Sequence, residues 1–273
     1  IQDNSLNLKV INMASLIRRV LDNGVTILYR QQLEAKTFGC VISSRVGSRH
    51  ENPSQHGITH LSEHIIFEGN DNFTAEKSIK REIQILGDKT NAHTDNENVA
   101  NHGRFSADDT IRGFDLLSKI FFQPTFPEYA VEQERGIVLN EIKQYEDDHF
   151  QACWGKMHES LWSGGLKSDT LGPKEIVSSL TREELYNWWT GTVLNGSNII
   201  VSAYGPMDFV SFQALVMGAT KHLSKGEEIT SEVDNINLGI RNFTERDTDL
   251  NYTIIAYPGV SVSDKNRFKL GAL

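Results

Sequence analysis

The pentapeptide HLSEH, residues His60-Leu61-Ser62-Glu63-His64, is the stretch from which the rest of the chain can be interpreted. Apolar residues recur at helical spacing from Ile58 onward, so we expect a helix there that ends at Gly69. Residues four apart lie on one helix face, and both imidazoles can therefore point at a single metal ion. Glu63 lies beside that face, where a carboxylate can take a proton from metal-activated water. An exposed polar helix with two unrelated histidines is the alternative.

A third ligand must come from elsewhere, because a catalytic zinc ion needs three protein ligands and an open position. The charged stretch from Pro127 to about His149 is expected to form one long helix. Glu134 and Glu141 are seven residues apart, which is two helical turns, so they share a face of that helix. Buried carboxylates are costly unless they are paired or bind a metal, which makes this face a candidate source of the ligand. A solvated face with scattered Glu and Lys residues is the alternative.

The flanking segments are rich in expected strands. Two β-rich runs, Gly24–Gln32 and Phe38–Val46, precede the HLSEH helix, and the short link between them predicts a hairpin. The run Thr90–Phe105 is interpreted as strand and turn, and the apolar run Asn198–Ala203 as a buried strand. The stretch Ser224–Asp249 is polar and low in aromatic residues, which makes it the best linker candidate. After it, Tyr252–Tyr257 is expected to form a further strand.

Composition excludes several classes of function. The 273-residue chain has a formal net charge of −9, which argues against non-specific nucleic-acid binding, since such binding requires Lys and Arg to neutralise phosphates. No stretch approaches the ~18 apolar residues needed for a membrane span. Two distant cysteines, Cys40 and Cys153, form no disulfide framework, so a reducing compartment is the default. We therefore expect a cytoplasmic location, with an organelle matrix or the periplasm as alternatives.

The sequence resembles the pitrilysin family of zinc peptidases, which includes insulin-degrading enzyme and mitochondrial processing peptidase. The family motif is H-x-x-E-H, then 76 residues, then Glu; here residues 65–140 intervene and the next residue is Glu141. The family also has a Glu seven residues earlier, where this chain has Glu134. Further similar segments are Leu21-Asp22-Asn23-Gly24, Val46-Gly47-Ser48-Arg49-His50-Glu51, Thr90-Asn91-Ala92-His93-Thr94 and Asn198 to Gly205. The resemblance extends over nearly the whole chain from about Leu21.

This resemblance implies a role for each candidate site residue. His60, His64 and Glu141 are expected to be the ligands of one Zn²⁺ per chain. Glu63 would be the general base that activates water, and Glu134 a second catalytic carboxylate that steadies the ligands. Asn91 and Ala92 would belong to an edge strand that binds an extended peptide substrate through main-chain hydrogen bonds.

The resemblance also implies the architecture. We expect an α+β fold in which a mixed, largely antiparallel sheet has helices packed on one face, followed by the start of a second similar lobe. Residues 1–225 would form the zinc-bearing catalytic lobe, residues 226–249 a linker and residues 250–273 the truncated beginning of the second lobe. In the family, a second half supplies an Arg and a Tyr that hold the substrate carbonyl. No counterpart is identified here, so a second lobe or a partner subunit, in a homo- or heterodimer, is expected to complete the chamber.

A few residues stand apart from this pattern. At Val99 and Asn101 the family usually has Thr and Tyr, a departure that concerns a substrate-side or packing contact and not the metal site. His50 and His56, in the loop before the HLSEH helix, are interpreted as loop residues, with metal ligation as the alternative.

The leading hypothesis is a zinc metalloendopeptidase, or its catalytic half, that hydrolyses peptide bonds in unstructured peptides. A non-catalytic family member that binds peptides is one alternative. A chain that binds zinc but needs a partner for activity is the other.

Overall fold

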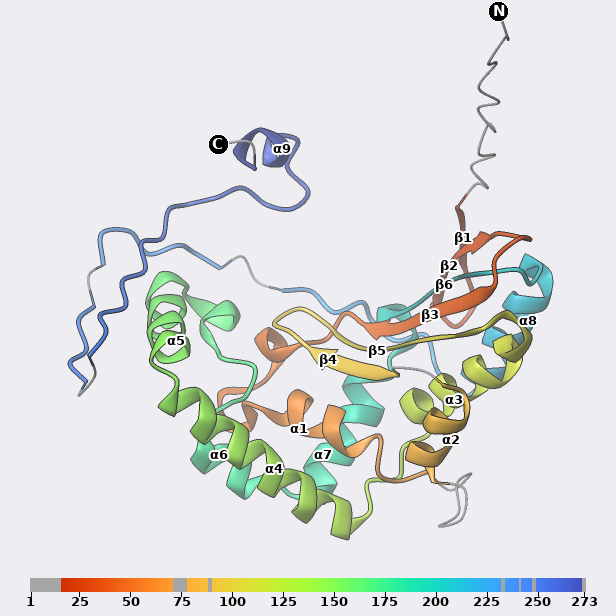
Figure 1. Ribbon diagram of the computed structural model, residues 1–273, viewed down its shortest axis with the longest axis horizontal. Helices are drawn as coiled ribbons and strands as arrows, with labels where there is room; N and C mark the ends of the chain where they lie inside the picture. The colour runs from red at the N-terminus through yellow and green to blue at the C-terminus, as the bar shows by residue number, and fades with distance from the viewer. Residues whose placement is uncertain are drawn as a thin grey trace, which may run out of the picture.

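The computed structural model describes residues 16–70, 78–87, 90–231, 234–240, 242–246 and 249–271. Its central feature is one six-stranded sheet with the strand order β1-β2-β6-β3-β5-β4 (Figure 1). The strands are β1 (Ile17–Val20), β2 (Thr26–Gln31), β3 (Thr37–Ser44), β4 (Asn91–Thr94), β5 (Val99–Ser106) and β6 (Ile199–Gly205). Only the β2–β6 pair among them is parallel, and the other neighbours are antiparallel. The expectation of a mixed, largely antiparallel sheet is confirmed.

The predicted hairpin between the first two β-rich runs is wrong. Strand β6 lies between β2 and β3, so that Ala203 pairs with Tyr29 on one side and with Cys40 on the other. Two strand spacings amount to ~10 Å, and the few residues between β2 and β3 span that distance when extended. A short link therefore did not discriminate between a hairpin and a step over one strand. Ile199, Val201 and Ala203 alternate along β6 and are buried, so one face of this strand packs on the core.

The helices pack on one face of the sheet, as expected (Figure 1). They are α1 (Ile58–Ile65), α2 (Ile79–Ile85), α3 (Thr110–Phe122), α4 (Glu128–Asp147), α5 (His149–Leu161), α6 (Lys174–Ser179), α7 (Arg182–Trp188) and α8 (Phe209–Thr220). The short helix α9 (Arg267–Leu270) lies apart from the sheet (Figure 1). Helix α1 lies between the sheet, where it contacts β4 and β5, and helices α4 and α7. In the described part of the chain, no helix is both long and apolar enough to cross a membrane.

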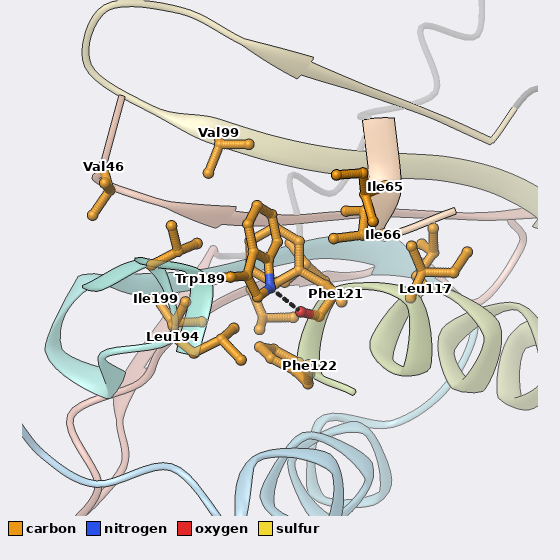
Figure 2. Close-up of a cluster of buried hydrophobic side chains, with 14 of the residues drawn as sticks. Val46, Ile65, Ile66, Val99, Leu117, Phe121, Phe122, Trp189, Leu194 and Ile199 are labelled. Carbon is orange, nitrogen blue, oxygen red and sulfur yellow. Dashed lines mark hydrogen bonds between the residues drawn. The ribbon is translucent and has the colours of Figure 1, made fainter. Parts of the chain in front are cut away.

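The core between sheet and helices fixes which way α1 faces. Trp189 is fully buried and donates from Nε1 to the Phe121 carbonyl at 3.0 Å, with the two rings 5.2 Å apart (Figure 2). Ile65 and Ile66, at the end of α1, are fully buried in this same cluster. Because one side of α1 packs into the core, His60 and His64 on another side of the helix are turned toward α4.

The segment after α8 was expected to link two lobes, and the division into 1–225, 226–249 and 250–273 stays a prediction. Two described stretches of it, residues 226–231 and 234–240, lie against the lobe, with a β-bridge between Trp162 and Ile236. Tyr252–Tyr257 does not form the predicted strand. A strand needs a neighbour for its backbone hydrogen bonds, and none of the described strands pairs with this segment.

Candidate metal centre

Helix α1 is held at its first turn by a buried carboxylate. Glu51 accepts hydrogen bonds from the backbone N–H groups of Gly57 at 2.8 Å and Thr59 at 2.9 Å. Burial raises the pKa of Glu51 to about 7, against the opposing effect of these hydrogen bonds. Gly57 has a φ of +91°, and an added Cβ would meet the Leu171 carbonyl oxygen at 2.5 Å. The start of the HLSEH helix is therefore fixed from several sides.

The two histidines of the helix face each other. The ring centroids of His60 and His64 are 4.8 Å apart, and their ring nitrogens lie with a Glu63 oxygen within 4.8 Å of one another. Both side chains are largely buried, with 13% and 19% of their surface exposed. Burial, followed by the neighbouring His64, lowers the pKa of His60 to about 4. His60 is thus neutral at physiological pH and has a lone pair free to bind a metal.

Helix α4 brings both of its candidate carboxylates to these histidines. The Glu134 Oε2 atom is 3.2 Å from His64 Nδ1, and Glu141 Oε2 is 3.8 Å from His60 Nε2 and 3.7 Å from His64 Nε2. Glu134 is only 5% exposed, whereas the Glu141 side chain is 37% exposed. Because Glu134 is buried, it does not belong to a solvated helix face with scattered charges. Seven-residue spacing placed the two carboxylates on one face, and that face meets α1.

These donors fit a zinc ion. Ligand atoms around a tetrahedral zinc are about 3.3 Å apart, given bonds of about 2.0–2.1 Å, and the distances from Glu141 to the two Nε2 atoms are close to this. The His64–Glu134 contact engages Nδ1, which leaves Nε2 free to ligate, as in carboxylate–histidine–zinc arrangements. His60 Nδ1 is buried and has no hydrogen-bond partner among the described residues. Two imidazoles and a carboxylate are a donor set that zinc favours.

Glu63 lies where a base is needed. It is 9% exposed, and Thr94 donates from Oγ1 to its Oε2 at 3.3 Å. Burial raises the pKa of Glu63, while the His64 charge and the Thr94 hydrogen bond act in the opposite direction and Glu141 adds to the rise. A raised pKa makes a carboxylate a stronger base, which suits proton abstraction near neutral pH.

The cleft in front of these residues continues along strand β4. It has a volume of about 720 Å³ and is lined by Asn91, Ala92 and Thr94 together with the histidines, Glu63 and Glu141. Among the described strands β4 pairs only with β5, so one edge of β4 is free beside the cleft. The structure thus brings together every site residue expected from the sequence.

Sequence reasoning missed the contacts of some residues. Thr94 was seen only as part of a similar segment, and its hydrogen bond to Glu63 joins residues 31 positions apart. The role of Glu51 could have been inferred from one local feature of the sequence. The N-cap of the helix, Gly57, has no side chain that can accept hydrogen bonds, and Glu51 is a carboxylate shortly before it. The two departures from the family pattern, Val99 and Asn101, are both fully buried, so they affect packing. Val99 lies in the hydrophobic cluster of Figure 2, and Asn101 donates from Nδ2 to the Leu117 carbonyl at 3.0 Å.

The loop histidines are engaged by other loop residues. His50 Nδ1 accepts from the Gly47 N–H at 3.0 Å, and its Nε2 is 2.8 Å from Ser231 Oγ. His56 Nε2 is 3.2 Å from Ser168 Oγ. Neither belongs to the group of potential ligands found among the described residues.

Comparison with known proteins identifies the family of this chain. The sequence model for insulinase, peptidase family M16, matches residues 26–174. The probable mitochondrial-processing peptidase subunit beta of Arabidopsis thaliana is 27% identical over 214 residues, covering 78% of this chain and 40% of that protein. An uncharacterized zinc protease of Rickettsia bellii is 25% identical over 248 residues, covering 90% of this chain and 60% of that protein. The chain thus spans about half the length of these curated relatives.

A solved structure shares the fold. A protease from Helicobacter pylori superposes with a TM-score of 0.72 at 16% identity, covering 81% of this chain and 53% of that protein. The family match covers more than half of the chain and includes α1, β4, α4 and α5, which confirms the resemblance seen in the sequence. The chain belongs to the insulinase family, peptidase family M16.

Proposed function

We propose that this chain is the metal-bearing part of a zinc endopeptidase that hydrolyses peptide bonds in extended, unstructured peptides. His60, His64 and Glu141 hold one Zn²⁺, Glu63 is the general base and Glu134 orients His64. The observation that carries the proposal is the meeting of α1 and α4, which gathers two histidines and two carboxylates in one cleft beside a free strand edge, with the Glu134 carboxylate against His64.

Each residue has a defined task in the hydrolysis. Zinc held at this site supplies a Lewis acid for the scissile carbonyl and lowers the pKa of water toward neutrality. Glu63 takes the proton of the attacking water on a carboxylate oxygen and can return it to the leaving amine. Strand β4, through Asn91 and Ala92, offers its free backbone N–H and C=O groups to an extended peptide, and Thr94 holds the Glu63 carboxylate.

The test combines metal content with cleavage of a mixed-sequence peptide library by the purified chain. Wild-type chain should bind zinc and cleave, while Glu63→Gln should bind zinc and lose cleavage, because the amide cannot accept the proton. Equal turnover by the wild-type and Glu63→Gln chains would show that Glu63 is not the base. A chain that binds no zinc, and whose function survives His60→Ala, would instead be a non-catalytic peptide-binding member.

The second candidate is a chain that binds zinc but cleaves only with a second lobe or partner subunit, in a homo- or heterodimer. Its supporting observation is that the chain covers only 40% and 60% of two relatives that are named as peptidases. Mixing the chain with a candidate partner and finding activity only in the mixture would support it. Activity of the chain alone would contradict it.

The compartment is also a proposal. The reducing default suggested by Cys40 and Cys153 is compatible with the cytoplasm and with an organelle matrix. The mitochondrial name of one relative supports the matrix alternative. Localisation of a tagged full-length protein would decide between them.

A further inference from the structure

The segment that follows the lobe is attached to it at several points. We call residues 226–231 and 234–240 the strap. The Ile229 N–H donates to Asn198 Oδ1 at 2.9 Å, and Glu228 forms an ion pair with Arg45 at the surface. Further along, the Asn237 N–H donates to the Leu161 carbonyl at 2.7 Å. The strap therefore runs from the end of the sheet to the end of α5.

The strap carries one buried charged residue, Asp234. The Asp234 side chain is only 3% exposed and forms an ion pair with Arg49, which is itself 10% exposed. Asp234 also accepts from the Leu166 N–H at 3.3 Å, and an added Cβ at Gly164 would meet its Oδ1 atom at 2.2 Å. A buried carboxylate persists only when it is paired and hydrogen-bonded, and Arg49 supplies that pairing.

Arg49 also holds the turn that connects β4 to β5. Its guanidinium pairs with Glu97 in that turn, and its backbone N–H donates to the Asn96 carbonyl at 3.0 Å. The neighbouring Ser48 N–H donates to the Asp95 carbonyl at 3.1 Å. The loop and the turn approach so closely that a Cβ at Gly47 would meet the Asp95 oxygen at 2.3 Å.

The turn held by Arg49 begins immediately after the strand that lines the cleft. Asp95 follows Thr94, the last residue of β4, and Thr94 donates its hydroxyl to Glu63. A continuous series of contacts thus runs from Asp234 through Arg49 and the turn to the general base.

We propose that Arg49, anchored by the strap residue Asp234, is a positioning residue that sets strand β4 at its distance from the metal helix. This inference rests on the proposed function, because β4 is the strand on which the peptide would bind. The strap thereby couples the chain beyond the lobe to the substrate strand.

The test uses the full chain with zinc, a library peptide that the wild-type chain cleaves, and amide hydrogen exchange. Arg49→Met should increase exchange at residues 91–98 about tenfold and raise KM about tenfold, with a smaller fall in kcat, since Thr94 of this strand holds Glu63, and with zinc content nearly unchanged. A tenfold change corresponds to about 1.4 kcal/mol. Exchange in α3, which the series of contacts does not include, should stay the same.

A matched control is available on the same strap. Arg45 is also an arginine paired with a strap carboxylate, but its side chain is 44% exposed and its partner Glu228 is 59% exposed. Arg45→Met should change neither the exchange at β4 nor KM. If it has the same effect as Arg49→Met, loosening of the strap in general is responsible and the specific role of Arg49 is refuted.

Two further variants separate positioning from stability. Arg49→Met combined with Asp234→Asn removes the buried charge that Arg49→Met leaves unpaired. The double variant should regain stability while its KM stays raised, and a KM that recovers together with stability would overturn the proposal.

A milder variant covers the case in which Arg49→Met fails to fold. Glu97→Gln removes only the ion pair between Arg49 and the turn, and it should still increase hydrogen exchange at β4. Unchanged exchange at β4 in Glu97→Gln would also overturn the proposal. A wild-type chain that neither binds zinc nor cleaves peptides would refute the proposed function. Hydrogen exchange at β4 would still test whether Arg49 positions that strand.

Discussion

Loss of the Glu134 carboxylate should weaken zinc binding without unfolding the chain. Glu134 Oε2 lies 3.2 Å from His64 Nδ1, and the residue is only 5% exposed, so solvent screens this contact little. Partners of this kind behind a metal ligand contribute about 10–100-fold to metal affinity, which is about 1.4–2.7 kcal/mol. Glu134→Leu should reach the upper part of that range. Glu134→Gln should show a smaller loss, because its amide oxygen still accepts from Nδ1–H.

The assay is competition for zinc against a chelator of known affinity, with circular dichroism to confirm folding. The control is Glu132→Gln on the same helix, since the Glu132 side chain is 71% exposed and pairs only loosely with Arg135 at 3.5 Å. The control should bind zinc like the wild-type chain. A folded Glu134→Leu chain with unchanged zinc affinity would refute the assignment of Glu134 as the residue that orients His64.

Three other predictions concern the residues around the site. Thr94→Val should lower kcat about tenfold with little change in KM, since the hydrogen bond to Glu63 is lost, and Thr94→Ser should restore it; a KM effect alone would contradict this. The pKa of Glu51 is raised to about 7 in the folded state, against about 4.5 when unfolded. The free energy of unfolding of the wild type should therefore fall relative to Glu51→Gln, by on the order of 3 kcal/mol, as pH rises from about 4.5 to about 7, and should level off above that; a constant difference between the two chains in urea unfolding at every pH would refute it. Trp189→Ala should destabilise the fold by about 3–5 kcal/mol in urea unfolding, and a loss below 1 kcal/mol would contradict its place in the core.

The metal helix and its partner could be predicted because the signals are local or periodic. The spacing of His60 and His64 fixes their common face, and that of Glu134 and Glu141 fixes theirs. That α4 faces α1 came from the family resemblance, because periodicity alone left a solvated helix open. The buried state of Glu134 answers that alternative.

The features that the sequence did not reveal depend on contacts between distant segments. Insertion of β6 between β2 and β3 joins residues more than 150 positions apart, and link length carried no information about it. The attachment of the strap depends on the Arg49–Asp234 ion pair, whereas the polar composition of that segment suggested only a linker. Tyr252–Tyr257 has strand-forming residues but no neighbouring strand among those described, and composition alone cannot supply one.

The most direct test of the central claim is the zinc content of the purified chain after dialysis against buffered zinc. The proposed centre predicts one Zn²⁺ per chain for the wild type and for Glu63→Gln, and almost none for His60→Ala. A wild-type chain that retains no zinc, or a His60→Ala chain that retains as much as the wild type, would contradict a metal centre formed by α1 and α4.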